Sequence, residues 1–352
     1  MPRLPAIDQQ KRAVYSSHVV ILGAGASRAA APSGDANGRR LPLVADFVDV
    51  VGLAPLLDNA GVAWRDRNFE EVYDGIYHSG RGLPLMGQLE SAIRDYFRKI
   101  ELRAGPTAYD YLLLSLREKD MIATFNWDPF LLQAYGRYAD LKHLPQVAFL
   151  HGNVSIGFCL TCKIKGGPNL WCRCGRPLEP SRLLYPVREK DYSGDPFIAT
   201  EWDGLRQVLE HAYFLTIFGY SAPTADAAAV EIMKTAWAAN ETRTLAEIEI
   251  IDIRPRDELE RTWSPFITRQ HYGITTDLKR SYLTSNPRRS CEALAFATLM
   301  LDPWPSNPIP DATSVADLRG WVKQLLDEED LLEQAGVPFS GKPSPGISNA
   351  AT

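Results

Sequence analysis

Short apolar runs recur along the chain. They are rich in β-branched or large apolar residues and lack a clean alternation of apolar and polar positions, which is typical of strands covered on both faces. Longer stretches with helical periodicity separate them. This alternation predicts an open, mostly parallel sheet with helices on both sides. The predicted strands are His18–Leu22, Met121–Thr124, Gln146–Leu150, Tyr213–Phe218 and Ile248–Ile253.

Four of these five runs are followed by residues that can do chemistry. In chain order these are Gly23–Ser27, Phe125–Asp128, His151 with Gly152, and Gly219–Ser221. In open α/β sheets, ligands bind outside the carboxyl ends of the strands, so we expect these loops to meet at one place. The sequence therefore predicts a Rossmann-like α/β fold with a ligand site at that edge.

Two insertions interrupt the predicted sheet. The first is rich in leucine and aromatic residues at helical spacing, and the second carries four cysteines with several prolines and glycines. We expect an α/β domain over 13–40, 119–155 and 200–300, a helical insertion over 41–118, a small metal-binding lobe over 156–195, a linker with C-terminal helices over 302–337, and a disordered tail over 338–352.

The C-terminal helix is predicted by a capping-box pattern, Ser314 with Asp317, after a proline-rich stretch. An apolar stripe follows, and it consists of Val315, Leu318, Val322 and Leu325, with Trp321 beside it. Such a stripe packs either onto its own domain or against another chain. The pattern leaves both open.

Composition narrows the class of protein. The 352 residues are 45% hydrophobic and 23% charged, as in globular proteins, and the formal net charge is −5. This charge argues against broad electrostatic binding of nucleic acid. The apolar runs are much shorter than the roughly 20 residues of a membrane span, and the N-terminus has no apolar signal segment. We expect a cytoplasmic protein with no membrane partner and no direct binding of nucleic acid.

The first candidate motif is the glycine loop Gly23-Ala24-Gly25-Ala26-Ser27, directly after a predicted strand. Glycines there let the backbone turn tightly and approach a pyrophosphate, whose charge the following helix amides meet. A dehydrogenase fingerprint needs a third glycine where this chain has Arg28. The loop therefore indicates a nucleotide site unlike that of hydride-transfer enzymes, and a tight turn without a ligand is the alternative.

Polar residues follow the next two strands. Asn126 and Asp128 lie two apart at a strand end and so point the same way, into the ligand crevice. His151 begins the next loop, where a neutral imidazole can accept a proton at neutral pH. Taken singly, the first pair also fits an ordinary turn, and the histidine fits a hydrogen-bonded structural role.

The fourth strand and the last one add candidate nucleotide contacts. Gly219 and Ser221 can close over a nucleotide, with the serine bonding to phosphate or ribose. Asp252 stands at the end of the last predicted strand, where a carboxylate commonly binds ribose hydroxyls. Structural roles are the alternatives for both.

The cysteines predict a metal site. Cys159, Cys162, Cys172 and Cys174 form two close pairs, the second followed by glycine, as a tetrahedral zinc site needs. The alternative is a cluster of buried thiols. Cys291 lies in an apolar helical run and is predicted to be in the core.

Taken in order, these motifs resemble those of the sirtuin family. Sirtuins carry GAGxS after a first strand, then N-x-D, then HG, a four-cysteine zinc module beginning eight residues after that histidine, and a G-T/Y-S loop. Here His151 and Cys159 are eight apart, and the resemblance covers roughly residues 19–255. It implies NAD as the substrate and a structural Zn²⁺.

The departures from the deacylases are informative. Their P-D-F-R segment is replaced by Leu41–Phe47, and the strand V-x-F-G-E that pairs with the acyl-lysine peptide is replaced by Leu183–Pro186. Proline cannot donate a ladder hydrogen bond. The chain therefore looks more like the bacterial sirtuin-like NAD hydrolases of antiphage defence.

That resemblance implies hydrolysis of the nicotinamide–ribose bond, giving ADP-ribose and nicotinamide. Asn126 would orient the water and the ribose, His151 would polarise the ribose hydroxyls or the water, and Asp128 would hold the nicotinamide or ribose side. Gly23, Ala24, Gly25, Ser27, Gly219, Ser221 and Asp252 would bind the dinucleotide. A homo-oligomer and a partner ATPase or other defence protein are expected on the family alone. A protein deacylase and a non-catalytic NAD or ADP-ribose sensor stay open.

Overall fold

The computed structural model describes residues 15–79, 82–187, 190–240, 245–268, 270–299 and 301–334. The predicted tail, 338–352, lies outside them. Among the described residues, no helix is long and apolar enough to cross a membrane.

Six parallel strands form the central sheet, as predicted. Their spatial order is β3-β2-β1-β7-β8-β9, with every neighbouring pair parallel. In chain order this is 3-2-1-4-5-6, the order of dinucleotide-binding α/β folds. The five predicted strands are confirmed, and the sixth, β9, was missed. The strands are β1 Ser17–Leu22, β2 Met121–Thr124, β3 Gln146–Phe149, β7 Ala212–Phe218, β8 Glu247–Ile251 and β9 His271–Thr275.

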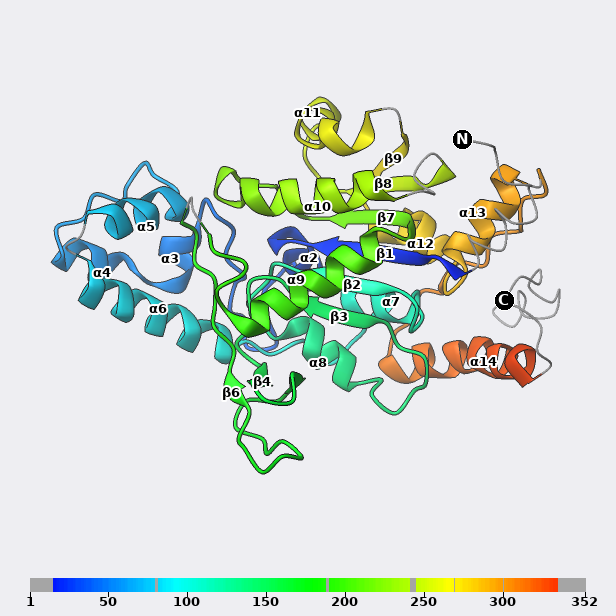
Figure 1. Cartoon of the computed structure of the whole chain (residues 1–352), viewed down its shortest axis with the longest axis horizontal. Coiled ribbons are helices and arrows are strands. Elements are labelled where there is room, and N and C mark those ends of the chain that lie inside the picture. Colours follow the sequence, from blue (N-terminus) through cyan, green and yellow to red (C-terminus); the bar gives the residue numbers. More distant parts are fainter. Residues whose placement is uncertain are drawn as a thin grey trace.

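Helices cover both faces of the sheet (Figure 1). Val19 and Ile21 of β1 lie in one apolar core with Trp202 of α9, whereas Val20 and Leu22 lie in another with side chains of α7, α8 and α14. The strand is buried on both faces, which explains its unbroken apolar run. The helices are α2 Ala24–Ala30, α7 Ala108–Leu114, α8 Phe130–Gly136, α9 Pro196–Leu209, α10 Ala227–Ala239, α11 Arg256–Ile267, α12 Tyr282–Ser285, α13 Ser290–Leu299 and α14 Val315–Gln334, with short 3₁₀ turns at Thr224–Asp226 and Leu278–Arg280.

Both insertions leave the sheet at its ligand side. The first forms a helical module beside the carboxyl ends of the strands, made of α3 Phe47–Val51, α4 Ala54–Asn59, α5 Phe69–His78 and α6 Leu83–Arg98 (Figure 1). The second forms a protruding lobe with a small antiparallel sheet of β4 Gly157–Cys159, β5 Ile164–Gly166 and β6 Glu179–Pro180. Predicted helical and small-lobe insertions are both present.

Helix α14 packs onto its own chain. Leu318 and Val322 are fully buried in the core beneath β1, and Leu325 is almost so. The predicted capping box is present, because Ser314 N donates to Asp317 Oδ2 at 2.9 Å and Asp317 N donates to Ser314 Oγ at 3.2 Å. Of the two fates open to the apolar stripe, the structure shows intramolecular packing.

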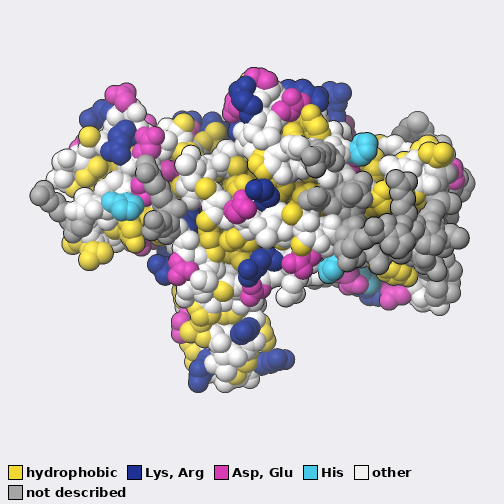
Figure 2. Space-filling view, turned by 45° about the horizontal axis from the view of Figure 1, so that its top comes forward, with side chains coloured by type: hydrophobic (Ala, Val, Ile, Leu, Met, Phe, Trp, Pro, Cys, Tyr) yellow, Lys and Arg dark blue, Asp and Glu magenta, His cyan; other side chains and the backbone are white. Residues whose placement is uncertain are grey.

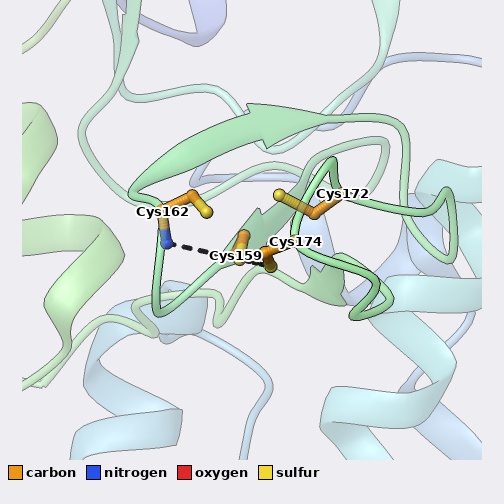
Figure 3. A group of neighbouring side chains, drawn as sticks. All are labelled: Cys159, Cys162, Cys172 and Cys174. Atoms are coloured by element: carbon orange, nitrogen blue, oxygen red, sulfur yellow. Dashed lines mark hydrogen bonds between the residues drawn. The ribbon is translucent and has the colours of Figure 1, made fainter.

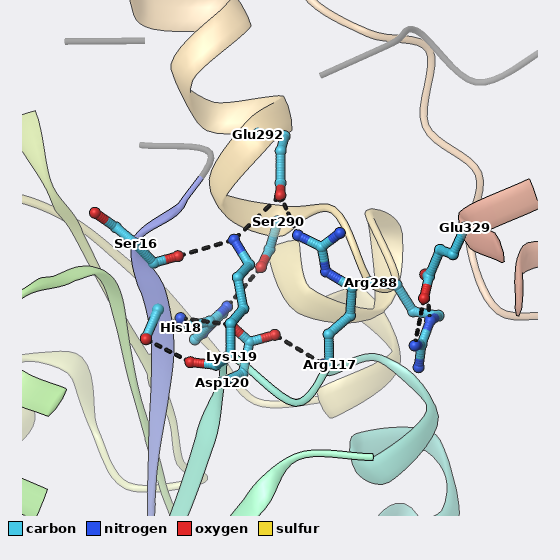
Figure 4. Close-up of polar contacts among 10 residues, drawn as sticks. Ser16, His18, Arg117, Lys119, Asp120, Arg288, Ser290, Glu292 and Glu329 are labelled. Atoms are coloured by element: carbon cyan, nitrogen blue, oxygen red, sulfur yellow. Dashed lines mark hydrogen bonds and ion pairs between the residues drawn. The ribbon is translucent and has the colours of Figure 1, made fainter. Parts of the chain in front are cut away.

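A buried charged cluster holds α13 and α14 at the amino ends of the strands (Figure 4). Glu292 of α13 pairs with Arg117 and with Lys119, the latter at 3.1 Å. Arg288 donates to Glu329 of α14 at 2.7 Å. Removing one member of a buried pair leaves an uncompensated charge, so these contacts fix where the helices sit.

His18 is the fully buried histidine of this region. Its ring nitrogens lie 2.7 Å from Ser290 Oγ and 2.8 Å from Thr216 Oγ1, and the ring stacks on Phe214. Burial, with a smaller contribution from Lys119, lowers the pKa of His18 to about 3. The folded protein therefore keeps this ring neutral where the unfolded chain begins to protonate it.

Acidification is expected to destabilise the protein through His18. The pKa of His18 is lower in the folded protein than in the unfolded chain. The contribution of the neutral His18 ring to the free energy of unfolding is therefore complete above about pH 6.5 and is lost as the pH falls toward 3. The loss amounts to about 2 kcal/mol between pH 7 and pH 5. His18→Asn should flatten the pH dependence of the melting temperature, whereas the same change at exposed His78 should not. Identical pH profiles for wild type and His18→Asn would contradict the assignment.

Candidate functional site

The predicted loops do meet, at the switch point where strand order reverses between β1 and β7. Backbone hydrogen bonds link the residue after each strand to the end of a neighbouring strand. Gly23 N donates to Phe218 O at 3.1 Å, Phe125 N to Leu22 O at 2.9 Å, and Leu150 N to Thr124 O at 2.9 Å. Ligands bind at this point in open α/β sheets. The site is therefore built from the carboxyl ends of β1, β2, β3 and β7.

The two glycine loops touch backbone to backbone. Gly25 N donates to Gly219 O at 2.9 Å. A Cβ on Gly23 would stand 2.5 Å from Tyr220 Cα, and one on Gly219 would stand 2.4 Å from Ala26 N. Gly219 also has a φ of +61°, which disfavours any residue with a side chain. Both glycines are required by this close approach. Ala24, at the tip, is exposed.

Gly219→Ala is expected to destabilise the protein. The left-handed backbone alone costs about 1–2 kcal/mol, and the contact with Ala26 adds to it. Gly273→Ala is the matched control, because a Cβ at Gly273 meets nothing within 4 Å. The melting temperatures of the two variants measure the effect. If both variants behave alike, the close packing of the loops is wrong.

Asn126 is the centre of a buried polar network. Its Nδ2 donates to Gly23 O at 2.8 Å and to Ser27 Oγ at 2.9 Å, and it lies 3.3 Å from Tyr109 Oη. The Gly23 carbonyl can only accept a hydrogen bond, so the atom that faces it is Nδ2. The other terminal atom of the Asn126 amide is therefore Oδ1. Within the described part of the chain, no hydrogen-bond donor meets that oxygen. Asn126 is therefore held by one end while the other can accept a hydrogen bond from a ligand or a water.

Asp128 has a supporting position. Ser27 Oγ donates to its Oδ2 at 2.6 Å, and Phe130 N, at the start of α8, donates to its Oδ1 at 3.1 Å. Burial raises the pKa of Asp128 to about 6, against the opposing effect of these donors. The Asp128 carboxylate thus orients the Ser27 hydroxyl and accepts the hydrogen bond from the first backbone amide of α8. Ser27, expected to bind the dinucleotide, is buried within this network.

His151 is buried and packs edge-on against Phe125, with 4.8 Å between the ring centroids. Its Nε2 is 3.4 Å from Tyr192 Oη and 3.6 Å from Asp226 Oδ1. Burial lowers the pKa of His151 to about 3; Asp226 opposes that shift and Lys190 adds to it. The ring is therefore a hydrogen-bonding group that stays uncharged throughout the physiological range.

The surroundings of His151 include residues that the motifs did not assign. Lys190 pairs with Asp226, which also accepts a hydrogen bond from Tyr220 Oη at 2.9 Å. The Tyr220 ring stacks on Phe125 at 4.1 Å. Asp226 follows Tyr220 by six residues, and this closeness in the sequence is only a weak indication that Asp226 belongs to the site. Nothing in the sequence points to Tyr109, Lys190 or Tyr192.

The two remaining residues predicted to contact a nucleotide, Ser221 and Asp252, lie outside the buried polar network around Asn126. Ser221 is exposed. Asp252 accepts from Arg254, whose Nη2 is 3.0 Å from Oδ2 and 3.4 Å from the carbonyl of Tyr220. The structure therefore brings Gly23, Gly25, Ser27, Asn126, Asp128 and Gly219 into direct contact, places His151 beside them, and leaves Ser221 and Asp252 outside.

The helical insertion covers the segment after the cysteine lobe. Tyr185 stacks on Tyr73 of α5 at 5.3 Å, and its hydroxyl donates to Glu90 O of α6 at 3.3 Å. Arg94 of α6 donates to Ser181 O at 3.3 Å. Residues 181–187 belong to no strand. This segment runs under helices α5 and α6.

The four cysteines come together in the lobe (Figure 3). One sulfur from each lies within 4.8 Å of the others, and Cys159 Sγ is 3.6 Å from Cys174 Sγ. Tetrahedral zinc with bonds of about 2.3 Å needs sulfurs about 3.8 Å apart, so the set fits one ion. The lobe's own apolar cluster contains Cys159, Cys172 and Leu178. Cys291 is buried in the core, as predicted.

No family model and no curated protein matches the chain. Among solved structures, it is similar to a Sir2 homologue in complex with NAD, at 16% identity and a TM-score of 0.40 over 83% of this chain and 94% of that one. A Sir2 complex with an inhibitor, 2′-O-acetyl-ADP-ribose and a deacetylated p53 peptide matches at 16% identity and 0.37, over 74% and 89%. A Sir2–p53 peptide–NAD⁺ structure matches at 16% and 0.36, over 78% and 94%.

Proposed function

We propose that this chain binds NAD at the switch point and hydrolyses its nicotinamide–ribose bond. The observation that supports this best is the state of Asn126, whose Nδ2 is held by Gly23 O and Ser27 Oγ while its Oδ1 stays available. A fixed acceptor at the carboxyl ends of β1 and β2 is suited to orient a ribose hydroxyl or a water molecule. The neutral ring of His151 supplies a second acceptor nearby.

The chemistry follows from the substrate. Nicotinamide leaves with the electron pair of its bond to the ribose, and the sugar becomes oxocarbenium-like. Water adds to the anomeric carbon, its proton passes to solvent, and ADP-ribose and neutral nicotinamide result. Fixed dipoles stabilise such a developing cation without reorganising. Asn126 positions the water or the ribose, and His151 accepts a hydrogen bond from the same groups.

The low pKa of His151 defines its role more narrowly. A ring with a pKa of about 3 is a weak base, so it orients hydrogen-bond donors without storing a proton. Nicotinamide release should then show no loss from protonation of His151 between pH 7 and pH 5. Asp128 acts through Ser27, which it orients.

The segment that follows the lobe favours water over an acyl-lysine as the acceptor of the ribose. In deacylases a strand after the zinc module pairs with the peptide. Here residues 181–187 form no strand, and α5 and α6 cover Ser181 and Tyr185. A peptide strand would have to displace these contacts. NAD depletion in antiphage defence is the biological role that we propose for this activity.

Zinc would be held by Cys159, Cys162, Cys172 and Cys174 and would stabilise the lobe. Four thiolates leave no open coordination position for water, so its contribution is to folding. The function is tested by incubating the purified chain with NAD and separating nicotinamide, ADP-ribose and intact NAD by chromatography. Release of nicotinamide with equimolar ADP-ribose is expected. Binding without cleavage would instead identify a sensor.

A further inference from the structure

The cysteine lobe, residues 157–180, exposes several large apolar side chains within one small element. Trp171 is 75% exposed, Leu170 60% and Leu160 54%. Large exposed apolar groups gathered on one small element mark an interaction site more often than a free surface. The lobe also protrudes from the body (Figure 1), so that a large partner can reach these side chains.

Counted over its Lys, Arg, Asp and Glu side chains alone, the same lobe is basic within an acidic chain. It contains four basic residues and one acidic residue, Glu179, although the whole chain has a net charge of −5. Lys165 pairs with Glu201 at the base of the lobe. Within the described residues, Lys163, Arg173 and Arg176 have no carboxylate partner. The end of the lobe in Figure 2 accordingly shows lysine and arginine side chains around apolar ones.

Backbone contacts hold the tryptophan and the arginines in one turn. Trp171 forms an isolated bridge with Pro177, and Cys172 N donates to Arg176 O at 2.8 Å. Arg176 Nη1 donates to Thr161 Oγ1 at 2.8 Å, which joins this turn to the other cysteine turn. The cysteine cluster lies between them. The backbone positions of the exposed tryptophan and of the arginines are thus held within one turn.

We propose that this surface binds single-stranded nucleic acid. An exposed aromatic ring stacks on an unpaired base, and unpaired cations beside it meet the phosphates. Small zinc modules recognise single strands in this way. An acidic protein would satisfy the charges as well, but a single strand presents a flat base beside every phosphate, and that repeating pair matches an exposed ring beside cations. The whole-chain charge, which argues against broad nucleic-acid binding, does not reveal this local site.

The test uses the full-length, zinc-loaded protein without NAD, so its outcome is independent of the proposed hydrolysis. Fluorescently labelled 20-nucleotide oligodeoxythymidine and oligouridine are titrated at two salt concentrations, with a 20-base-pair duplex as comparison. Binding of the single strands with a negative salt dependence is expected, because phosphate contacts release counterions. Quenching of tryptophan fluorescence should accompany it.

Trp171→Ala should weaken binding about 5-fold or more, as loss of one stacked base predicts. Arg173→Gln should weaken it and reduce the salt slope by about one counterion. The matched control is the neighbouring pair Trp64 and Arg65 in the helical insertion, where the guanidinium lies over the indole at 4.9 Å. Trp64→Ala and Arg65→Gln should leave affinity unchanged. Zinc content and melting temperature verify that each variant is folded.

Three results would overturn the proposal. The first is the absence of binding to either single strand at low salt. The second is equal weakening by the Trp171 and Trp64 changes. The third is competition by polyglutamate as strong as that by oligodeoxythymidine, with no effect of Trp171→Ala, which would identify an acidic protein partner instead.

Discussion

Asn126→Ala is expected to reduce nicotinamide release by about 100-fold or more, with NAD still bound. Losing a positioned catalytic group typically has an effect of this size. The residue contributes one hydrogen bond to Gly23 O and one to Ser27 Oγ, so the glycine loop loses a support but keeps its backbone contacts with Phe218 and Gly219. His151→Ala should have a comparable effect. Single-turnover release and calorimetric titration of NAD separate cleavage from binding.

Controls distinguish a chemical role from a folding one. Asn126→Asp keeps an acceptor but loses the donors to Gly23 and Ser27, so it should be intermediate in activity and less stable. Asn37→Ala and His78→Ala remove the same residue types from exposed positions and should leave release unchanged. Near wild-type release by Asn126→Ala or His151→Ala would show that the site has been wrongly assigned.

Replacing any one cysteine of the lobe should abolish zinc binding and unfold the lobe. The lobe's described apolar cluster is very small, so we expect a bound metal to supply most of its stability. Elemental analysis should find about one zinc per wild-type chain and little in Cys172→Ser. Cys291→Ala is the matched control, since that thiol is buried far along the chain in α13. A metal-free, folded and active wild type would contradict the prediction.

The apolar runs were sufficient to predict five strands of the sheet, because four of them are almost wholly buried and the fifth, β3 at one edge, still ends in buried Ala148 and Phe149. β9 escaped notice since its sequence, His271–Thr275, is only partly buried at the sheet edge. The position of α14 was left open by its sequence. An apolar stripe on a helix indicates that one face of the helix is buried, but it does not indicate against what. The structure shows that Leu318 and Val322 of α14 pack into the core of their own domain.

For the candidate site, likewise, the sequence predicts which loops meet but not which contacts their residues make. Loops after consecutive strands must converge, so Gly23, Asn126, His151 and Gly219 could be grouped from the sequence. Their individual roles depend on contacts across the fold, such as Ser27 with Tyr109, which are 82 residues apart, and His151 with Asp226. The low pKa of His151 arises from burial that no local pattern encodes.

The most direct measurement of the central claim is product analysis of NAD incubated with the wild-type protein, with and without an acetyl-lysine peptide. We predict nicotinamide and ADP-ribose in equal amounts, unchanged by the peptide and lost in Asn126→Ala. Release of nicotinamide only with peptide, accompanied by O-acetyl-ADP-ribose, would contradict the hydrolase proposal, and intact NAD in every sample would contradict catalysis altogether.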